Sequence, residues 1–250
     1  MYENKYDFTN ALVQFERSLD LRKRCLTLDH PLIEETLSTM GFVYNKEGNN
    51  VKALVYLNEA VDLQLKTESI YLASTCISIG SIHHSKQDHK NVLLYYQKAL
   101  KYAANDNPEL GPLYYQIGLI YDGEKDFDMA LENYQNTLKF PSNIDSIIVD
   151  IYNRMGQIYH TKRDYSEVLC NYKKALSFCI EQKSDATLIY YHMAWVYDNK
   201  LEHKKALRFY KKALNENKTQ ESPSSDLFSR VYNNMAGIYA RSDEFKSQYD

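Results

Sequence analysis

The sequence predicts an all-α protein made of stacked helical hairpins, and three observations support this. The 250 residues include only 8 Gly and 5 Pro, too few for the many turns of a strand-rich fold. Apolar residues recur at three- and four-residue spacing, which is typical of amphipathic helices. A pattern of small, aromatic and alanine-like residues returns about every 38 residues. A period of that length indicates stacked copies of one supersecondary unit.

Each copy of the pattern has a small residue followed three positions later by an aromatic residue or its substitute. An alanine-like, a large apolar and a second alanine-like residue follow the small one after 12, 16 and 19 positions in five copies. This spacing predicts two helices per copy that cross closely at the small residue. A Gly inside a helix costs about 1 kcal/mol relative to Ala, so its repeated use indicates a contact that needs it. The small anchors are Gly41, Gly80, Gly118, Gly156, Ala194 and Ala236.

Breaks rich in Asp, Asn, Ser and Pro separate the copies and supply helix-capping oxygens. They predict one array over 1–250, without a second domain. Its expected divisions are a partial repeat at 1–28, repeats at 31–67, 69–104, 108–140, 144–181 and 184–217, and a partial repeat at 224–250. Because the pattern stops within a repeat at both ends, we expect a fragment of a longer array or an incomplete gene model.

The recurring residues resemble the tetratricopeptide repeat, which asks for an aromatic residue, a Leu-Gly pair, a Tyr, an Ala, an aromatic residue and another Ala. The resemblance covers essentially the whole chain. It implies a right-handed superhelical solenoid of antiparallel helix hairpins whose concave wall binds proteins or peptides. Two stretches that match well are Tyr114, Ile117, Gly118, Tyr121, Ala130 and Tyr134, and Tyr190, Met193, Ala194, Tyr197, Ala206, Tyr210 and Ala213.

The copies are longer than the usual repeat of about 34 residues. One of them carries Asp29, His30 and Pro31 before its first helix. That copy resembles the longer repeats of kinesin light chains, which are cargo adaptors.

Charge and composition exclude several classes of partner. The net charge is −3, with 30 basic and 33 acidic residues interspersed. Without a basic stripe, no nucleic-acid partner is expected. No apolar run approaches the roughly 20 residues of a membrane span, and the N-terminus lacks a signal-peptide pattern. Four scattered cysteines without a CxxC pair are typical of thiols in a reducing compartment. We therefore expect a cytoplasmic protein with no membrane partner.

Signatures of catalysis are absent from the sequence, which has no phosphate loop, no GxSxG and no HExxH motif. His83 and His84 are adjacent, but His83 stands where other copies place a core Tyr. Neighbouring residues on a helix point in different directions, so core packing explains His83 better than metal ligation. We predict no enzyme activity, cofactor or metal site in this chain.

By the resemblance, groove residues lie three before, one after and four after each small anchor. Trp195 is the most distinctive of them: its ring either packs against the next hairpin or anchors a partner side chain, as aromatic residues do at binding hot spots. Apolar neighbours would extend this anchor into a strip, polar ones would orient the ligand, and asparagines would bond a peptide backbone. The predicted peptide-binding groove comprises Phe42, Ile77, Tyr115, Leu119, Asn153, Gln157, Tyr191, Trp195, Asp198, Asn233 and Asn234.

The sequence thus predicts a protein–protein interaction scaffold or adaptor that binds a peptide or helix with apolar anchors. Two alternatives remain open. One is a kinesin-light-chain-like cargo adaptor. The other is the regulatory or targeting arm of a larger enzyme, for example an ADP-ribosyltransferase, whose catalytic domain lies outside this fragment. Truncated repeats at the two ends would also expose apolar surface for end-to-end self-association.

Overall fold

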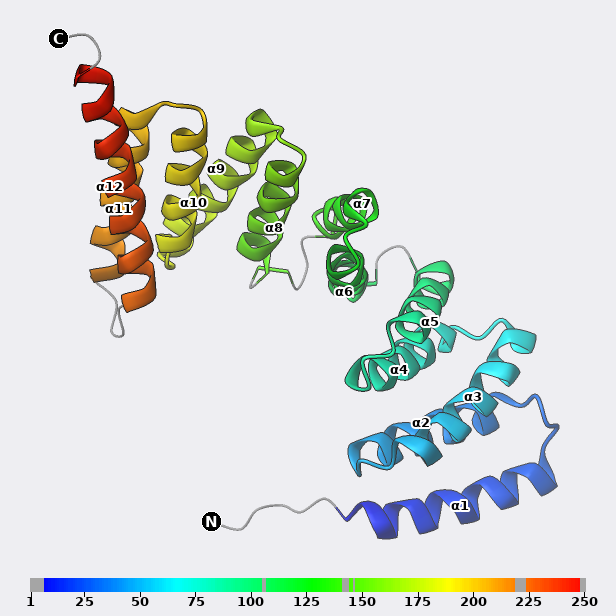
Figure 1. The fold of residues 1–250 in the computed structure, drawn as a ribbon. Coiled ribbons are helices and arrows are strands. Elements are labelled where there is room, and N and C mark those ends of the chain that lie inside the picture. Colours follow the sequence, from blue (N-terminus) through cyan, green and yellow to red (C-terminus); the bar gives the residue numbers. More distant parts are fainter. Residues whose placement is uncertain (1–6, 105–106, 141–143, 146, 219–223, 248–250) are drawn as a thin grey trace. The chain divides into compact units, whose positions relative to one another are not determined.

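The computed structural model describes residues 7–104, 107–140, 144–145, 147–218 and 224–247. These described residues form helices and turns without a strand (Figure 1). The expected partial repeats at 1–28 and 224–250 lie partly outside them. The helices are α1 Phe8–Cys25, α2 Pro31–Lys46, α3 Asn50–Thr67, α4 Leu72–Ser85, α5 His89–Tyr102, α6 Leu110–Gly123, α7 Phe127–Thr137, α8 Ile148–Thr161, α9 Tyr165–Gln182, α10 Thr187–Asn199, α11 His203–Lys218 and α12 Ser225–Ser247.

The chain forms two compact units, one up to Gly123 with α1–α6 and one from Glu124 onward with α7–α12. In the first unit, α2 pairs with α3 and α4 with α5 as hairpins, and α1 lies against α2. In the second unit, α8 pairs with α9 and α10 with α11, and α12 lies against α11 and α10. The predicted all-α class of helical repeats is confirmed. The division into individual repeats stays a prediction.

A common turn joins the two helices of a hairpin. An Asx residue caps the second helix: Asp164, for example, accepts a bond of 3.2 Å from the backbone N–H of Glu167. The residue before it, Arg163, has a left-handed backbone with φ of 60°. The turn closes when the Asp164 N–H donates to the carbonyl of Tyr159 at 3.0 Å. Capping of this kind is worth about 1 kcal/mol, so the turn fixes where each second helix begins.

Small anchors lie where the two helices of a hairpin approach most closely. A Cβ added to Gly156 would lie 2.5 Å from Cε1 of Tyr172 on α9. A Cβ on Gly41 would lie 2.5 Å from Cγ of Leu57 on α3. Real Cβ atoms do not approach other carbons so closely, so these hairpins need glycine for their spacing. The sequence interpretation of the glycine anchors is confirmed at both positions.

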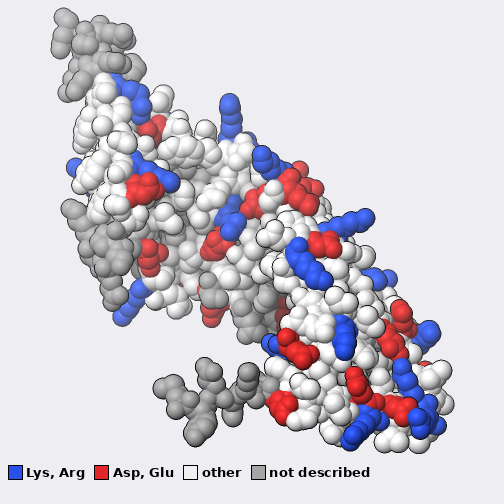
Figure 2. All heavy atoms as spheres, turned by 60° about the horizontal axis from the view of Figure 1, so that its bottom comes forward, with Lys and Arg blue, Asp and Glu red and all other residues white. Residues whose placement is uncertain are grey.

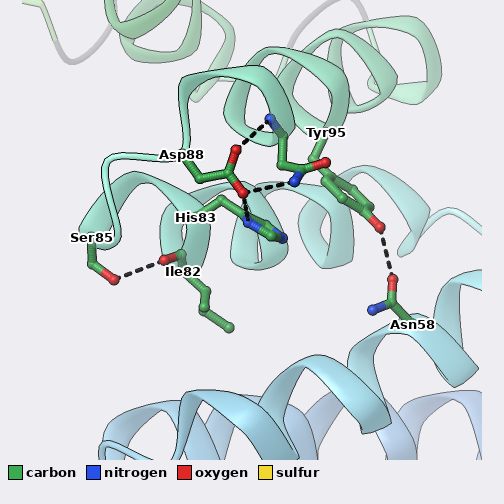
Figure 3. Close-up of polar contacts among 7 residues, drawn as sticks. Asn58, Ile82, His83, Ser85, Asp88 and Tyr95 are labelled. Carbon is green, nitrogen blue, oxygen red and sulfur yellow. Dashed lines mark hydrogen bonds and ion pairs between the residues drawn. The ribbon is translucent and has the colours of Figure 1, made fainter.

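An aromatic layer closes several hairpins next to the turn. Tyr197 stacks on Phe209 with ring centroids 5.3 Å apart. His83 takes the same place in α4: its ring stacks on Tyr95 at 5.8 Å, and its Nδ1 lies 3.0 Å from the capping carboxylate of Asp88 (Figure 3). The interpretation of His83 as a core substitution is confirmed. In the part of the chain that the structure describes, no His, Cys, Asp and Glu side chains gather as a metal would require.

Surface charge is mixed. On the face drawn in Figure 2, basic and acidic side chains alternate, and neither sign forms a continuous patch. Among the described helices, none is long and apolar enough to cross a membrane.

Candidate functional site

First helices of successive hairpins lie side by side within each unit and carry the predicted groove residues. In the first unit, Ser38 of α2 lies 3.3 Å from Thr75 of α4, oxygen to oxygen. In the second unit, the His160 ring of α8 contacts Trp195 of α10. Neighbouring first helices therefore contact each other within each unit, and Trp195 is the predicted groove residue that takes part in these two contacts.

Trp195 packs on the preceding hairpin. Its ring is half-buried, and its centroid lies 4.0 Å from that of His160, with the two planes tilted by 42°. Tyr165 also contacts His160, in an edge arrangement with ring centroids 5.8 Å apart. The sequence analysis left open that the ring packs against the next hairpin, whereas the observed contact is with His160 of the preceding hairpin. Trp195 remains partly exposed beside this contact.

Two polar side-chain atoms of α8 lack a hydrogen-bond partner. They are Oδ1 of Asn153 and Nε2 of His160, both on α8 and both inaccessible to solvent. Asn153 and His160 are seven residues apart, so they share one face of the helix. Burial lowers the pKa of His160, so the ring is neutral at pH 7. An unpaired buried polar atom costs about 1–3 kcal/mol, so this face of α8 carries a cost in the folded chain.

Asp198 is engaged within the protein. Arg241 of α12 donates to both of its carboxylate oxygens, at 2.8 and 3.0 Å, and Nδ1 of His203 lies 3.2 Å from Oδ1. The sequence analysis did not identify Arg241. A signal was present, because Asp198 lies four and Arg241 five residues after the anchors of neighbouring first helices.

Asn234 also has partners in the structure. Its amide donates to the hydroxyl of Tyr210 at 3.0 Å and reaches that of Tyr191 at 3.5 Å. Tyr191 is half-buried, and its ring lies 6.0 Å from that of Tyr210. Asn233, the next residue back along α12, is exposed. Of these two predicted asparagines, Asn234 joins α12 to the preceding hairpin, while Asn233 faces solvent.

His192 of α10 was not among the predicted residues. Its ring stacks on Tyr172 of α9 at 5.5 Å and meets the edge of Tyr191. Burial, together with the nearby His160 and Arg230, lowers its pKa to about 4. His192 stands two residues before its anchor, as Asn234 does, and that shared position was the available signal.

The remaining predicted residues differ in exposure. Phe42 of α2 is 49% exposed, and Gln157 of α8 is also exposed. Ile77 of α4 is half-buried, as are Tyr115 and Leu119 of α6. The apolar strip expected from α6 to α10 would span both compact units and stays a prediction.

Comparison with known families identifies the repeat. Residues 73–106, 111–139 and 188–220 each match the family model described as tetratricopeptide repeat. The chain contains tetratricopeptide repeats. The match falls on the α4–α5 hairpin, on the stretch from α6 to α7, and on the α10–α11 hairpin. Among curated proteins, none matches the sequence.

Several solved structures have a fold similar to that of this chain. YrrB, described as a tetratricopeptide-repeat protein with an unusual peptide-binding site, aligns with a TM-score of 0.63 at 17% identity, over 88% of this chain and 97% of its own. MamA aligns with a TM-score of 0.53 at 22% identity, over 73% and 99%. BtubC (BKLC) from P. vanneervenii aligns with a TM-score of 0.54 at 16% identity, over 88% and 96%. At these identities, the likeness shows the shared fold.

Proposed function

We propose that this chain is a protein-interaction scaffold that binds a peptide or helix with apolar anchors along its first helices. Its tetratricopeptide repeats support the general role, since stacked hairpins of this kind leave a row of variable first-helix residues free for contact. YrrB, which shares the fold, is described as having a peptide-binding site. In this proposal the chain itself carries no catalysis.

The observation that carries the proposal is the surface around Trp195 in the second unit. The indole is partly exposed there and is supported by the His160 ring, with ring centroids 4.0 Å apart. An apolar ligand side chain would pack on the exposed part of the indole. Asp198 is held in place by Arg241 and His203, so it shapes the edge of the site.

Trp195 also provides a direct measurement, because it is the single Trp of the sequence. We would select peptides from a displayed random library on the full chain and titrate the selected peptides while following Trp195 fluorescence. We expect the emission to shift on binding. Trp195→Ala, assayed by calorimetry, should weaken affinity at least tenfold, as aromatic hot spots do.

Leu188→Ala is the matched control, because Leu188 lies on the same helix and is 55% exposed. Its affinity should equal that of the unmodified chain. Selected peptides that bind Trp195→Ala as tightly as the unmodified chain would contradict the proposed site.

Self-association is a second part of the proposal. Helix α12 leaves Ala236 exposed and Tyr239 47% exposed, at positions where α10 buries Ala194 completely beneath α11. A second copy of the chain would cover this face. Sedimentation velocity should then show concentration-dependent association that Tyr239→Lys removes, whereas a constant monomer would contradict it.

We also propose a cytoplasmic location, which agrees with four free thiols at Cys25, Cys76, Cys170 and Cys179.

A further inference from the structure

A small cavity lies between the first helices α2 and α4 of the first unit. It has a volume of about 280 Å³, and its wall is rich in hydroxyl groups: Ser38 and Thr39 of α2, and Ser74, Thr75 and Ser78 of α4. Phe42 forms one side, and the buried Leu57 forms the floor. No Lys or Arg and no acidic side chain lines this cavity. Its chemistry therefore depends on which way the hydroxyl protons point.

Those protons are used by the helices themselves. Thr39 donates to the carbonyl of Glu35 at 2.8 Å, Ser74 donates to that of Tyr71 at 2.8 Å, and Ser78 donates to that of Ser74 at 3.0 Å. A hydroxyl oxygen has one proton and two lone pairs, so each of these oxygens retains acceptor capacity. The cavity wall thus presents hydrogen-bond acceptors.

Deeper in the wall, Ser38 and Thr75 belong to a separate network. Their oxygens lie 3.3 Å apart, and the amide of the fully buried Gln64 donates to Ser38 at 3.1 Å. This network fixes the position of α2 against α4. The three acceptors of Thr39, Ser74 and Ser78 are therefore held on a rigid support.

Phe42 adds an aromatic face to these acceptors. Its side chain is 49% exposed, and the ammonium group of Lys46 already lies 5.2 Å from the ring centroid. The negative face of an aromatic ring attracts cations, and this internal contact is an example. Lys46 follows Phe42 by one helical turn, whereas Ser38 and Thr39 precede it by one turn, and Lys46 is not among the residues that line the cavity.

Acceptors beside an aromatic face select a ligand with donors and positive charge. Carboxylates and phosphates offer acceptors only and would meet the same kind of group in the wall. An alkyl side chain would leave the acceptors without a new bond. A guanidinium has five N–H donors in a plane and stacks flat on aromatic rings, so it satisfies several acceptors and the ring together.

We propose that this cavity is a subsite for an arginine side chain of a bound peptide. The inference rests on the proposed scaffold function and adds a second recognition site, in the first unit, to the one at Trp195. A partner would accordingly carry an arginine for the first unit and an apolar anchor for the second.

Titration of the isotope-labelled chain with acetyl-Gly-Arg-Gly-amide, followed by NMR, tests the subsite. We expect millimolar binding with shifts confined to the backbone amides near Phe42, Ser74 and Ser78. The citrulline peptide has the same shape without the charge and should bind at least threefold more weakly. Equal shifts with citrulline, or shifts outside the cavity only, would overturn the proposal.

Variants sharpen the test. Phe42→Leu and Ser78→Ala should each weaken binding of the arginine peptide about threefold, while Lys46→Met should leave it unchanged or strengthen it. Ser85→Ala is the matched control, because Ser85 of α4 donates to the carbonyl of Ile82 in the same manner (Figure 3) but does not line the cavity. Loss of binding in Ser85→Ala as large as in Ser78→Ala would contradict the subsite. Trp195 fluorescence reports the second unit separately, so failure of the arginine subsite and failure of the proposed function are distinguishable.

Discussion

Tyr172 and Tyr210 occupy the same position in two consecutive hairpins. Each contacts the first helix of the following repeat, α10 for Tyr172 and α12 for Tyr210, but the two contacts differ in chemistry. Tyr172 of α9 is covered by the ring of His192, stacked at 5.5 Å. Tyr210 of α11 receives a hydrogen bond of 3.0 Å from Asn234. Burial raises the pKa of both tyrosines, and the bond from Asn234 acts against that rise for Tyr210.

The comparison teaches what a repeat position does and does not specify. His192 and Asn234 both stand two residues before the small anchor of their helix, and both contact the tyrosine of the preceding second helix. The position determines that a contact is made. The residue type decides whether the contact excludes water or satisfies a hydroxyl group. The His192–Tyr172 contact and the Asn234–Tyr210 contact should therefore respond differently to pH and to substitution.

The largest expected effect is the pH dependence of stability that arises from His192, whose ring stacks on Tyr172. The pKa of His192 is about 4 in the folded chain, below the ordinary 6.5. Because folding favours neutral His192, its full contribution is present above pH 6.5 and is lost as pH falls from 6.5 to 4. The free energy of unfolding should decrease by about 2–3 kcal/mol over that range, measured by urea unfolding.

His192→Phe keeps an aromatic ring on Tyr172 and removes the titrating group. We expect the decrease between pH 6.5 and 4 to become smaller in this variant. An unchanged pH profile would show that the loss of stability between pH 6.5 and 4 does not come from the protonation of His192.

A second prediction concerns the spacing of the same hairpin. Gly156→Ala would place a Cβ 2.5 Å from Tyr172, and the buried ring has little room to move. Overpacking costs about 1–3 kcal/mol and outweighs the gain in helix propensity, so the variant should be less stable by about 1–2 kcal/mol in urea unfolding.

Gly237→Ala is the control for that substitution. At Gly237 the nearest atom to an added Cβ is Nη1 of Arg241 at 3.4 Å, at the end of a flexible side chain. This variant should be unchanged or more stable by up to about 1 kcal/mol. If both glycine variants lose the same stability, close helix approach is not the reason that α8 carries Gly156.

The smallest expected effect concerns the hydrogen bond from Asn234 to Tyr210. Asn234→Ala leaves the buried hydroxyl without its donor and should lower the free energy of unfolding by about 1 kcal/mol. Asn233→Ala changes the exposed neighbour on α12 and should alter stability by less than about 0.5 kcal/mol. No difference between the two variants would mean that water replaces Asn234 at no cost.

Much of the candidate site was predictable in position but not in detail. The place of Trp195 on a first helix, beside Ala194, was predictable from the register of the repeat, and its role in a groove stays a prediction. The contact of Trp195 with His160 was not predictable, since the sequence does not tell which neighbouring hairpin a large ring leans on. Likewise Asp198 was expected to face a ligand, whereas Arg241, which is 43 residues away, occupies it in the structure.

The sequence by itself determined the all-α hairpins, the anchors at which helices cross and the faces that first helices turn to one another. These features follow from the 3.6-residue period and from capping, which act over a few residues and can be seen in the chain itself. Tertiary structure alone decided which polar groups find partners: Asp198 with Arg241, Asn234 with Tyr210, and none for Asn153 Oδ1. Such pairing depends on distances of a few ångströms between side chains that are 43 and 24 residues apart in the chain, and on the water that their packing excludes.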